Sequence, residues 1–270
     1  MRRPVVIRSF IFFFLLIIGS ALVSAQTNGA GITGAERLIG ETLKYDGSIS
    51  RNIFRGISIA ELTFTTTAVP GTDDLMITSQ AVSKGTLLKL ARYSFLQRYE
   101  STVDLPSFKI LRTGKHDVQK QRIRDSEAVF DYEQKRVTFV ETDPNDANRP
   151  PRRIATHIDG HMYDMITAIY ATRLMPLEVG KKIELPVSDS GLVYKVPILV
   201  TAREQQKTVL GKVWCFRLEP EIFGPGRLIE QKGKMTVWIT DDARRIPVRA
   251  EVRSGVGKIN IKLKQTTKPR

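Results

Sequence analysis

Alternation of apolar and polar residues at every second position is the feature of this chain that most limits its fold. It is visible in "ETLKYDGSIS", "SFKILRTGK", "RVTFVET" and "KINIKLKQT". Successive side chains of a strand point to opposite faces, so this period is typical of strands with one covered face. In "FRGISIAELTFTTTAV" the alternation changes phase near Ala60, which predicts a β-bulge. The sequence therefore predicts a mainly β fold, an antiparallel meander curved into a half-barrel or folded as a sandwich.

One segment, "MYDMITAIYATRL", has the period of a helix instead. Residues at three- and four-residue spacing lie on one face of such a helix, and here most of them are apolar. That face comprises Met162, Met165, Ile166, Ile169, Tyr170, Arg173 and Leu174. Pro176 and Gly180 end the pattern. We therefore expect one principal helix over about residues 162–174, packed on the sheet.

The first 25 residues have the pattern of a secretory signal peptide. Arg2, Arg3 and Arg8 flank the apolar run "SFIFFFLLIIGSALV", and "VSA" supplies small residues for cleavage after Ala25. The run is shorter than the roughly 20 residues of a spanning helix, although retention as an uncleaved anchor is the alternative. The next residue is Gln26 rather than cysteine, so we do not expect a lipoprotein. The prediction is an exported protein, periplasmic or extracellular, with no transmembrane span after processing.

The rest of the chain is predicted to form one domain. "QTNGAGITGAE" is rich in glycine, so residues 26–39 are expected to be a flexible linker. A single β-rich domain follows over residues 40–266, and residues 267–270 form a tail. The chain has one cysteine, Cys215, which excludes an internal disulfide. It lies in the alternating segment "KVWCFRL", where we expect a buried, unreactive thiol.

The chain is strongly basic. Loss of the first 25 residues removes three arginines and no acid, so the net charge of +14 falls to +11. Outside the cytoplasm such a surface favours anionic lipid, lipopolysaccharide or an envelope polymer as partner. A solvated surface without a specific partner and an envelope protein as partner are the alternatives. Aromatic and basic residues are not interleaved, so we do not expect nucleic acid to bind.

Two carboxylates stand beside two arginines in "VWITDDARRIPVRAEV". Asp241 and Asp242 are good turn residues because their side chains can accept hydrogen bonds from the backbone two residues on. Arg244 and Arg245 are placed to neutralise them, and Pro247 suits an edge strand or the first position of a strand. "VFDYEQKRVTFVE" has the same layout. The pattern favours a structural hairpin over an active site.

The segment "HIDGHMYD" is the only one that resembles a metal site. It brings His157, Asp159, His161 and Asp164 within eight residues, and imidazole with carboxylate can bind zinc. The alternative is a loop entering a helix, with Asp159 as N-cap and Asp164 in the first turn. We treat His157, Asp159 and His161 as weak candidates and expect no metal or other cofactor. The sequence has no G-x-S-x-G, G-x-x-x-x-G-K-[ST] or H-E-x-x-H motif.

Several segments resemble the bacterial family called domain of unknown function 3108. They are "GETLKYDGSI", "VDLPSFKI", "AVFDYEQKRV", "YDMITAIYATRLMPLEVGKKIELPV" and "VWITDDARRIPVRAEV" followed by "GVGKINIKL", in the family's order over roughly residues 40–265. The resemblance implies an exported or envelope-associated β-rich protein and no activity. It marks as structural positions Asp164, Arg173, Gly180, Trp238, Asp241, Asp242 and Pro247. The approach to the helix, "TDPNDANRPPRRIATHIDGH", is longer than the family pattern, so its histidines take no role from the resemblance.

A single helix of about a dozen residues, about 18 Å long, can cover only part of a broad sheet. Either the sheet closes over a filled core, or a concave apolar groove remains. We predict a groove beside the helix with basic residues at its rim, suited to an acyl chain with an anionic head. Its expected residues are Met165, Ile169, Arg173, Trp214 and Trp238. The expected function is a non-catalytic binding or assembly protein of the envelope, and the alternative is a metal-dependent or carboxylate hydrolase of envelope polymer.

Overall fold

The computed structural model describes residues 34–51, 54–90, 92–255 and 257–267. The predicted signal peptide lies outside these residues. The helices are η1 (Ala35–Leu38, a 3-10 helix), α1 (Thr86–Leu90) and α2 (Met165–Leu174). The strands are β1 (Thr42–Arg51), β2 (Phe54–Ala68), β3 (Asp74–Ser83), β4 (Phe95–Asp104), β5 (Ile110–Gln119), β6 (Arg122–Asp131), β7 (Arg136–Thr142), β8 (Arg152–His157), β9 (Lys182–Asp189), β10 (Leu192–Thr208), β11 (Gly211–Pro220), β12 (Gly233–Thr240), β13 (Pro247–Ser254) and β14 (Gly257–Thr267).

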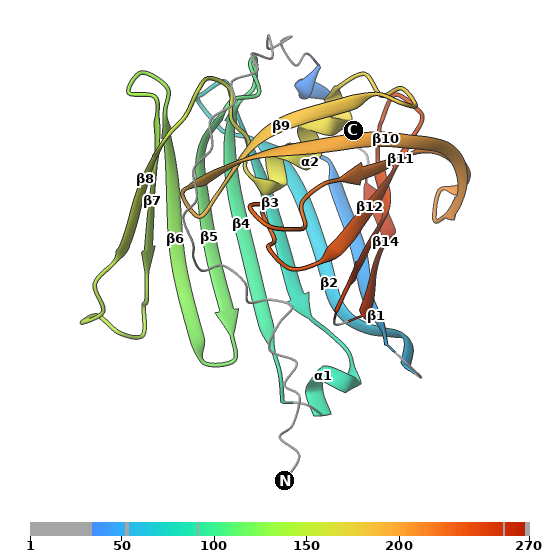
Figure 1. The fold of residues 1–270 in the computed structure, drawn as a ribbon, viewed down its shortest axis with the longest axis horizontal. Coiled ribbons are helices and arrows are strands. Elements are labelled where there is room, and N and C mark those ends of the chain that lie inside the picture. The colour runs from blue at the N-terminus through green and yellow to red at the C-terminus, as the bar shows by residue number, and fades with distance from the viewer. Residues whose placement is uncertain (1–33, 52–53, 91, 256, 268–270) are drawn as a thin grey trace.

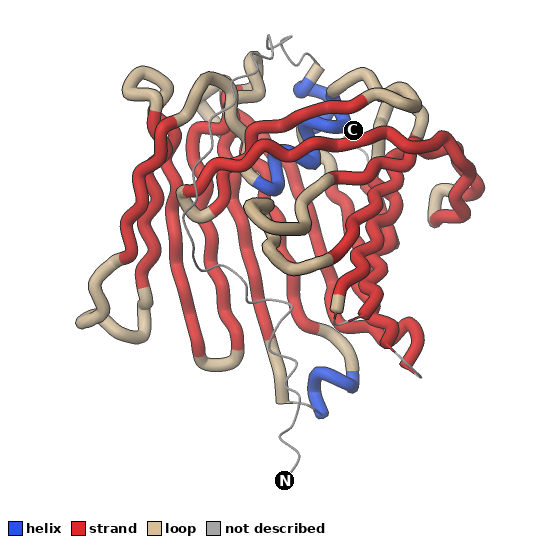
Figure 2. The backbone as a smooth tube through the Cα atoms, viewed as in Figure 1, coloured by secondary structure: helices blue, strands red, loops and turns tan. Residues whose placement is uncertain are grey.

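The described strands form one antiparallel sheet of 14 strands, in the spatial order β8-β7-β6-β5-β4-β3-β2-β1-β14-β13-β12-β11-β10-β9. Two meanders, β1 to β8 and β9 to β14, are joined where β14 pairs with β1. The sheet curves strongly, so that β9 and β10 cross over α2 while the long strands pass behind it (Figures 1 and 2). This confirms the predicted mainly β fold in its half-barrel form.

A bulge contributes to the curvature at the predicted place. Gly47 lies opposite Ala60, but its neighbour Ser48 lies opposite Ser58, so Ile59 is an extra residue in β2. An extra residue bends its strand and increases the local twist. The bulge expected near Ala60 is therefore confirmed.

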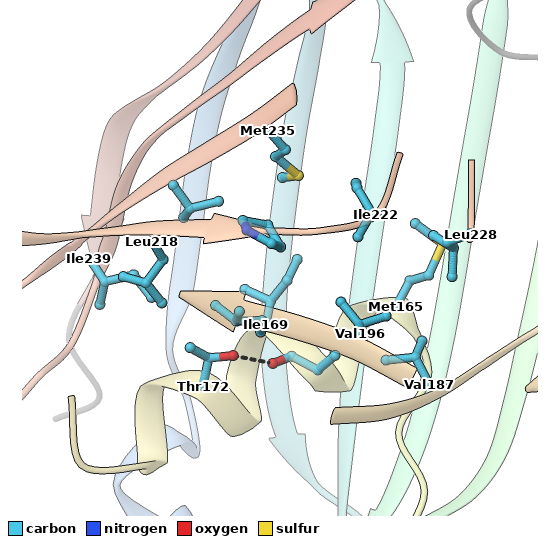
Figure 3. Close-up of a pocket in the computed structure, with 14 residues that line it drawn as sticks. Met165, Ile169, Thr172, Val187, Val196, Leu218, Ile222, Leu228, Met235 and Ile239 are labelled. Carbon is cyan, nitrogen blue, oxygen red and sulfur yellow. Dashed lines mark hydrogen bonds between the residues drawn. The ribbon is translucent and has the colours of Figure 1, made fainter. Parts of the chain in front are cut away.

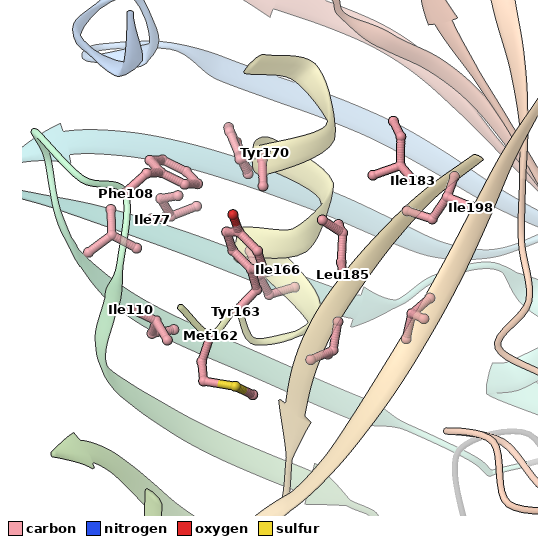
Figure 4. Close-up of a cluster of buried hydrophobic side chains, with 14 of the residues drawn as sticks. Ile77, Phe108, Ile110, Met162, Tyr163, Ile166, Tyr170, Ile183, Leu185 and Ile198 are labelled. Carbon is pink, nitrogen blue, oxygen red and sulfur yellow. The ribbon is translucent and has the colours of Figure 1, made fainter. Parts of the chain in front are cut away.

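Helix α2 lies inside the curve of the sheet. In Figure 4, Ile77 and Phe108 approach the helix from one side and Leu185 and Ile198 from the other, with Tyr170 of the helix between them. All five are buried. The helix is thus packed between the two meanders, which explains why the chain needs so little other helix to cover its sheet.

The start of α2 differs from the expectation. Asp164 is the N-cap, and its Oδ1 accepts hydrogen bonds from the backbone N–H groups of Ile166 and Thr167 at 3.0 and 2.7 Å. The Thr167 hydroxyl in turn accepts from the backbone N–H of Asp164 at 2.8 Å, which completes a capping box. Asp159, the N-cap we expected, stays in the loop before the helix.

The two edge strands of the sheet come close at one point. The Thr156 hydroxyl on β8 donates to the carbonyl of Gly191, in the turn between β9 and β10, at 2.6 Å. A Cβ at Gly191 would lie 2.6 Å from the Cβ of Phe139, and the residue has a φ of +81°. Only glycine fits both the backbone conformation and the space. The half-barrel therefore nearly closes here.

The predicted domain boundaries shift slightly at both ends. Ala35 and Leu38 of η1 are each 1% exposed and belong to the main core cluster. They lie inside the segment 26–39 that we expected to be a flexible linker, so the folded part begins earlier than expected. Thr267, assigned to the tail, is paired with Thr42 as the last residue of β14.

Candidate ligand-binding pocket

An apolar cavity of about 130 Å³ lies between α2 and strands β9 to β12. Figure 3 shows side chains from the helix and from the surrounding strands pointing into this common space. It is lined by Met165, Ala168, Ile169, Thr172, Val187, Val196, Ile198, Leu218, Pro220, Ile222, Leu228, Met235, Val237 and Ile239. We call this cavity the apolar pocket. Its one hydroxyl, on Thr172, donates to the Ala168 carbonyl at 2.8 Å, so the lining offers no free polar side chain.

Part of the lining faces solvent. Met165, Ile169, Ile222, Met235 and Val237 are each only half-buried. A cavity of about 150 Å³ with such a lining stays dry and binds a molecule the size of benzene. The apolar pocket can therefore hold a short apolar group or the end of a longer chain, with the remainder outside.

A small polar chamber of about 30 Å³ adjoins the apolar pocket, and Met165 lines both. Ser188 and Asp189 are 3% and 8% exposed there, and the Ser188 Oγ and Asp189 Oδ2 atoms have no hydrogen-bond partner in the part of the chain that the structure describes. Burial raises the pKa of Asp189 to about 6. The Lys115 ammonium also lines the chamber and lies 5.0 Å from the centre of the Tyr99 ring. The chamber has room for about one water molecule, which would satisfy these atoms.

The structure brings two of the five expected groove residues together, namely Met165 and Ile169. Trp214 lies outside the apolar pocket. It lies on the same face of β11 as Leu218, four residues earlier in the strand, but it is 45% exposed. The Arg203 guanidinium lies 4.5 Å from its ring centre. Strand alternation indicates the face correctly but not how far the cover extends along it.

Trp238 also lies outside the apolar pocket. Its neighbours Val237 and Ile239 line the pocket, so Trp238 points to the opposite face of β12. There its indole N–H donates to the Glu204 carboxylate, and the Arg249 guanidinium lies 4.6 Å from its ring centre. The structure thus gives Trp238 a packing contact on the outer face.

Arg173 is 1% exposed and is occupied by structural contacts. It forms a two-point ion pair with Glu41, and its Nε donates to the Arg245 carbonyl at 2.9 Å. It does not line the apolar pocket. The lining of the apolar pocket carries no charged side chain, so the basic residues that we expected at the rim of the groove are not among the residues that line it.

The Asp241–Pro247 segment forms the turn between β12 and β13. Asp242 Oδ1 accepts from the backbone N–H groups of Arg244 and Arg245 at 3.1 and 3.2 Å. Asp241 instead contacts side chains, with its Oδ1 3.0 Å from the Arg245 Nη1. Pro247 is the first residue of β13. The hairpin interpretation fits these contacts.

The histidines of the weak metal candidate lie apart. His157 is exposed and its Nε2 is 2.7 Å from Asp159 Oδ1. The Nε2 of His161 contacts the Phe108 carbonyl at 3.1 Å, and its ring lies 4.8 Å from that of Tyr163. Burial lowers the pKa of His161, which favours the neutral ring. Within the described ranges, no three His, Cys, Asp or Glu side chains are grouped to hold a metal ion.

Part of the pocket lining was not indicated by the sequence. Ile222 and Leu228 come from the loop between β11 and β12, where no period exists to assign them a side. Val187, Val196 and Ile198 lie on β9 and β10, and the sequence does not indicate that these strands pack against the helix. The sequence marks these residues only as apolar strand residues, a pattern that many core strands share.

Comparison with known proteins agrees with this fold. A crystal structure of a β-barrel-like protein of domain of unknown function DUF1849 from Brucella abortus has 10% identity and a TM-score of 0.57, covering 86% of this chain and 99% of that one. It shows the same overall fold. A protein from Bacteroides fragilis described as exported, with a YmcC-like fold, has 9% identity and a TM-score of 0.33, covering 85% and 96% of the two chains. A protein from Parabacteroides distasonis described as a lipoprotein has 10% identity and a TM-score of 0.31, covering 86% and 96%. The last two scores are too low to establish a shared fold.

No helix in the described part of the chain is long and apolar enough to cross a membrane. A search of curated proteins found no match. The family model "Protein of unknown function (DUF3108)" matches residues 44–264, which includes the strands and α2 that form the apolar pocket. The chain therefore belongs to the DUF3108 family.

Proposed function

We propose that this protein is an exported, non-catalytic binding protein of the cell envelope that holds the apolar end of an amphipathic ligand. The N-terminal pattern of basic residues, apolar run and small residues supports export. The observation that carries the binding role is the apolar pocket, with its uncharged lining and half-exposed mouth. Apolar surface left in contact with water is unfavourable by about 25 cal/mol per Å², so an apolar ligand would be stabilised there.

The size of the pocket limits the ligand. Sites that enclose a whole drug-sized molecule usually have about 300–1,000 Å³, more than twice the 130 Å³ found here. A short apolar segment fits, so the end of an acyl chain is the ligand group proposed. The lining holds no histidine, cysteine, aspartate or glutamate, so the geometry supports binding rather than hydrolysis.

A fluorescence titration tests this function. A fatty acid with an environment-sensitive fluorophore on its chain should bind the full chain saturably. Ala168→Trp puts an indole into the pocket, and Ile169→Lys puts an ammonium into the apolar lining at a half-exposed position. Each should weaken binding at least tenfold.

Val209→Trp is the matched control because Val209 is 51% exposed in the β10–β11 turn. It should bind as the unaltered chain does. Equal binding by all four proteins, with unchanged thermal unfolding, would show that the probe sits elsewhere and would overturn the proposed function.

A further inference from the structure

A second cavity lies on the outer face of the sheet, away from α2. Along β1 and β14, Tyr45 and Leu263 are buried and pair with each other. Ser48, Ser50 and Asn260 alternate with them and therefore point outward. The cavity is open, has about 430 Å³, and lies over β1, β2, β13 and β14. It is lined by Ser48, Ser50, Arg51, Arg55, Gly56, Arg249, Lys258, Asn260 and Lys262. We call it the basic cradle.

The basic cradle gathers five cations and no carboxylate in its lining. The adjacent Glu251 is shared among three cations, Arg249 at 2.8 Å, Arg253 at 2.6 Å and Lys258 at 2.8 Å. Arg51, Arg55 and Lys262 form no ion pair with any described residue. Clustered like charges repel one another, so this arrangement favours an anion from outside the chain.

Arg249 holds a fixed position in the cradle. It lies over the Trp238 ring, and its Nη2 donates to Glu251 and to the Asn260 side chain at 2.8 and 3.1 Å. Its Nε is buried and has no hydrogen-bond acceptor among the described residues. A buried donor of a charged group without an acceptor is unfavourable. The Trp238 ring and the two Nη2 contacts therefore hold the Arg249 side chain in the lining of the cradle.

We propose that the basic cradle binds the phosphate groups of an anionic lipid bilayer. Planar guanidinium groups match phosphate oxygens, and ammonium groups add point charges. The cradle is open and lies on an outward face, as contact with an extended surface requires. The site is separate from the apolar pocket and does not depend on the function proposed for it.

Co-sedimentation with vesicles tests the proposal. The full chain is expressed so that any processing occurs as in the cell, and every variant shares the same N-terminus. The cradle variant is Arg51→Gln/Arg55→Gln/Lys262→Gln. Each basic residue near an anionic membrane contributes about fivefold to binding. Binding to phosphatidylglycerol vesicles should therefore fall by about 10- to 100-fold.

The control variant is Lys207→Gln/Lys212→Gln/Lys232→Gln, which removes the same charge from exposed positions on other strands and loops. It should lose less than about threefold, well below the cradle variant. Equal losses in the two variants would show that diffuse charge, not the cradle, drives binding. Equal binding to phosphatidylcholine vesicles would also overturn the proposal.

A titration with inorganic phosphate separates the two sources of the anion. The proposal expects weak or unsaturated binding of free phosphate and strong binding of the anionic vesicles. A saturable phosphate site that the cradle variant loses, together with no vesicle binding, would assign the cradle to a free phosphate compound and contradict the membrane proposal. The titration of the acyl probe should be the same for the cradle variant and the unaltered chain, so the two proposals can fail independently.

Discussion

Arg173 of α2 and Glu41, just before β1, form a two-point ion pair in the interior, with Nη1–Oε2 at 2.6 Å and Nη2–Oε1 at 2.7 Å. The two residues are 1% and 8% exposed. The ring of Tyr170 lies 5.0 Å from the guanidinium. The pair connects the helix inside the sheet to the strand that joins the two meanders, so it fixes where α2 sits beside the apolar pocket.

Removal of one partner should therefore be strongly destabilising. Arg173→Met leaves Glu41 as an uncompensated buried charge, and we expect a loss of about 3–5 kcal/mol in the free energy of unfolding. The double variant Arg173→Met/Glu41→Leu leaves no unpaired charge and should lose less than the sum of the two single variants. Urea unfolding of the four proteins measures this coupling. Additive losses would mean that the two side chains do not interact.

The turn between β12 and β13 should depend on Asp242 more than on Asp241. Asp242 accepts two backbone hydrogen bonds in the turn, whereas the Asp241 carboxylate contacts arginine side chains among the described residues. Asp242→Ala should lower the free energy of unfolding by about 0.5–2 kcal/mol, the range of a lost capping bond. Asp241→Ala should lower it by about 1 kcal/mol or less, as for a partly exposed ion pair. The reverse order in thermal unfolding would contradict this account of the turn.

Asp189 should make stability depend on pH. Burial raises its pKa from 3.8 to about 6 in the folded chain. Between these values the folded state binds more protons than the unfolded state, so this residue's contribution to stability is lost as pH rises through about 4 to 6. Asp189→Asn should therefore match the unaltered chain near pH 4 and exceed it at pH 7.5 by about 3 kcal/mol. An equal difference at both pH values would show that Asp189 does not titrate in this way.

Cys215 should react slowly with thiol reagents. It is fully buried, and burial raises the pKa of its thiol to about 11, so little thiolate exists near neutral pH. Labelling of the folded protein should proceed only as fast as the chain opens, and should become fast in denaturant. Rapid labelling of the native protein would mean that the thiol is exposed.

Local periodicity was sufficient to predict the mainly β fold, the bulge near Ala60 and the principal helix, but not β8, which lies in a segment expected to be a loop. It was not sufficient to predict partners that are distant in sequence. Arg173 was placed correctly on the inner face of the helix, but its partner Glu41 is 132 residues away, so the buried ion pair was mistaken for part of a groove. Asp164 was recognised near the helix start, while its N-cap role depends on a backbone conformation that sequence alone does not specify.

The sequence led us to expect an apolar groove beside the helix, and the cavity found there contains only some of the expected residues. Met165 and Ile169 follow from the helical period. Trp214 and Trp238 were expected in the groove, but one is 45% exposed and the other faces outward. Ile222 and Leu228 enter from a loop. The lining therefore depends on how β9 to β12 cross α2, which only the tertiary structure specifies.

Native mass spectrometry of protein purified from its own envelope fraction tests the central claim most directly. The account predicts that the unaltered chain and Val209→Trp each carry one lipid per chain, and that Ala168→Trp, in which an indole occupies the apolar pocket, carries none. An unaltered chain without any bound lipid, or the same lipid adduct on folded Ala168→Trp, would contradict the claim that this pocket binds an acyl chain.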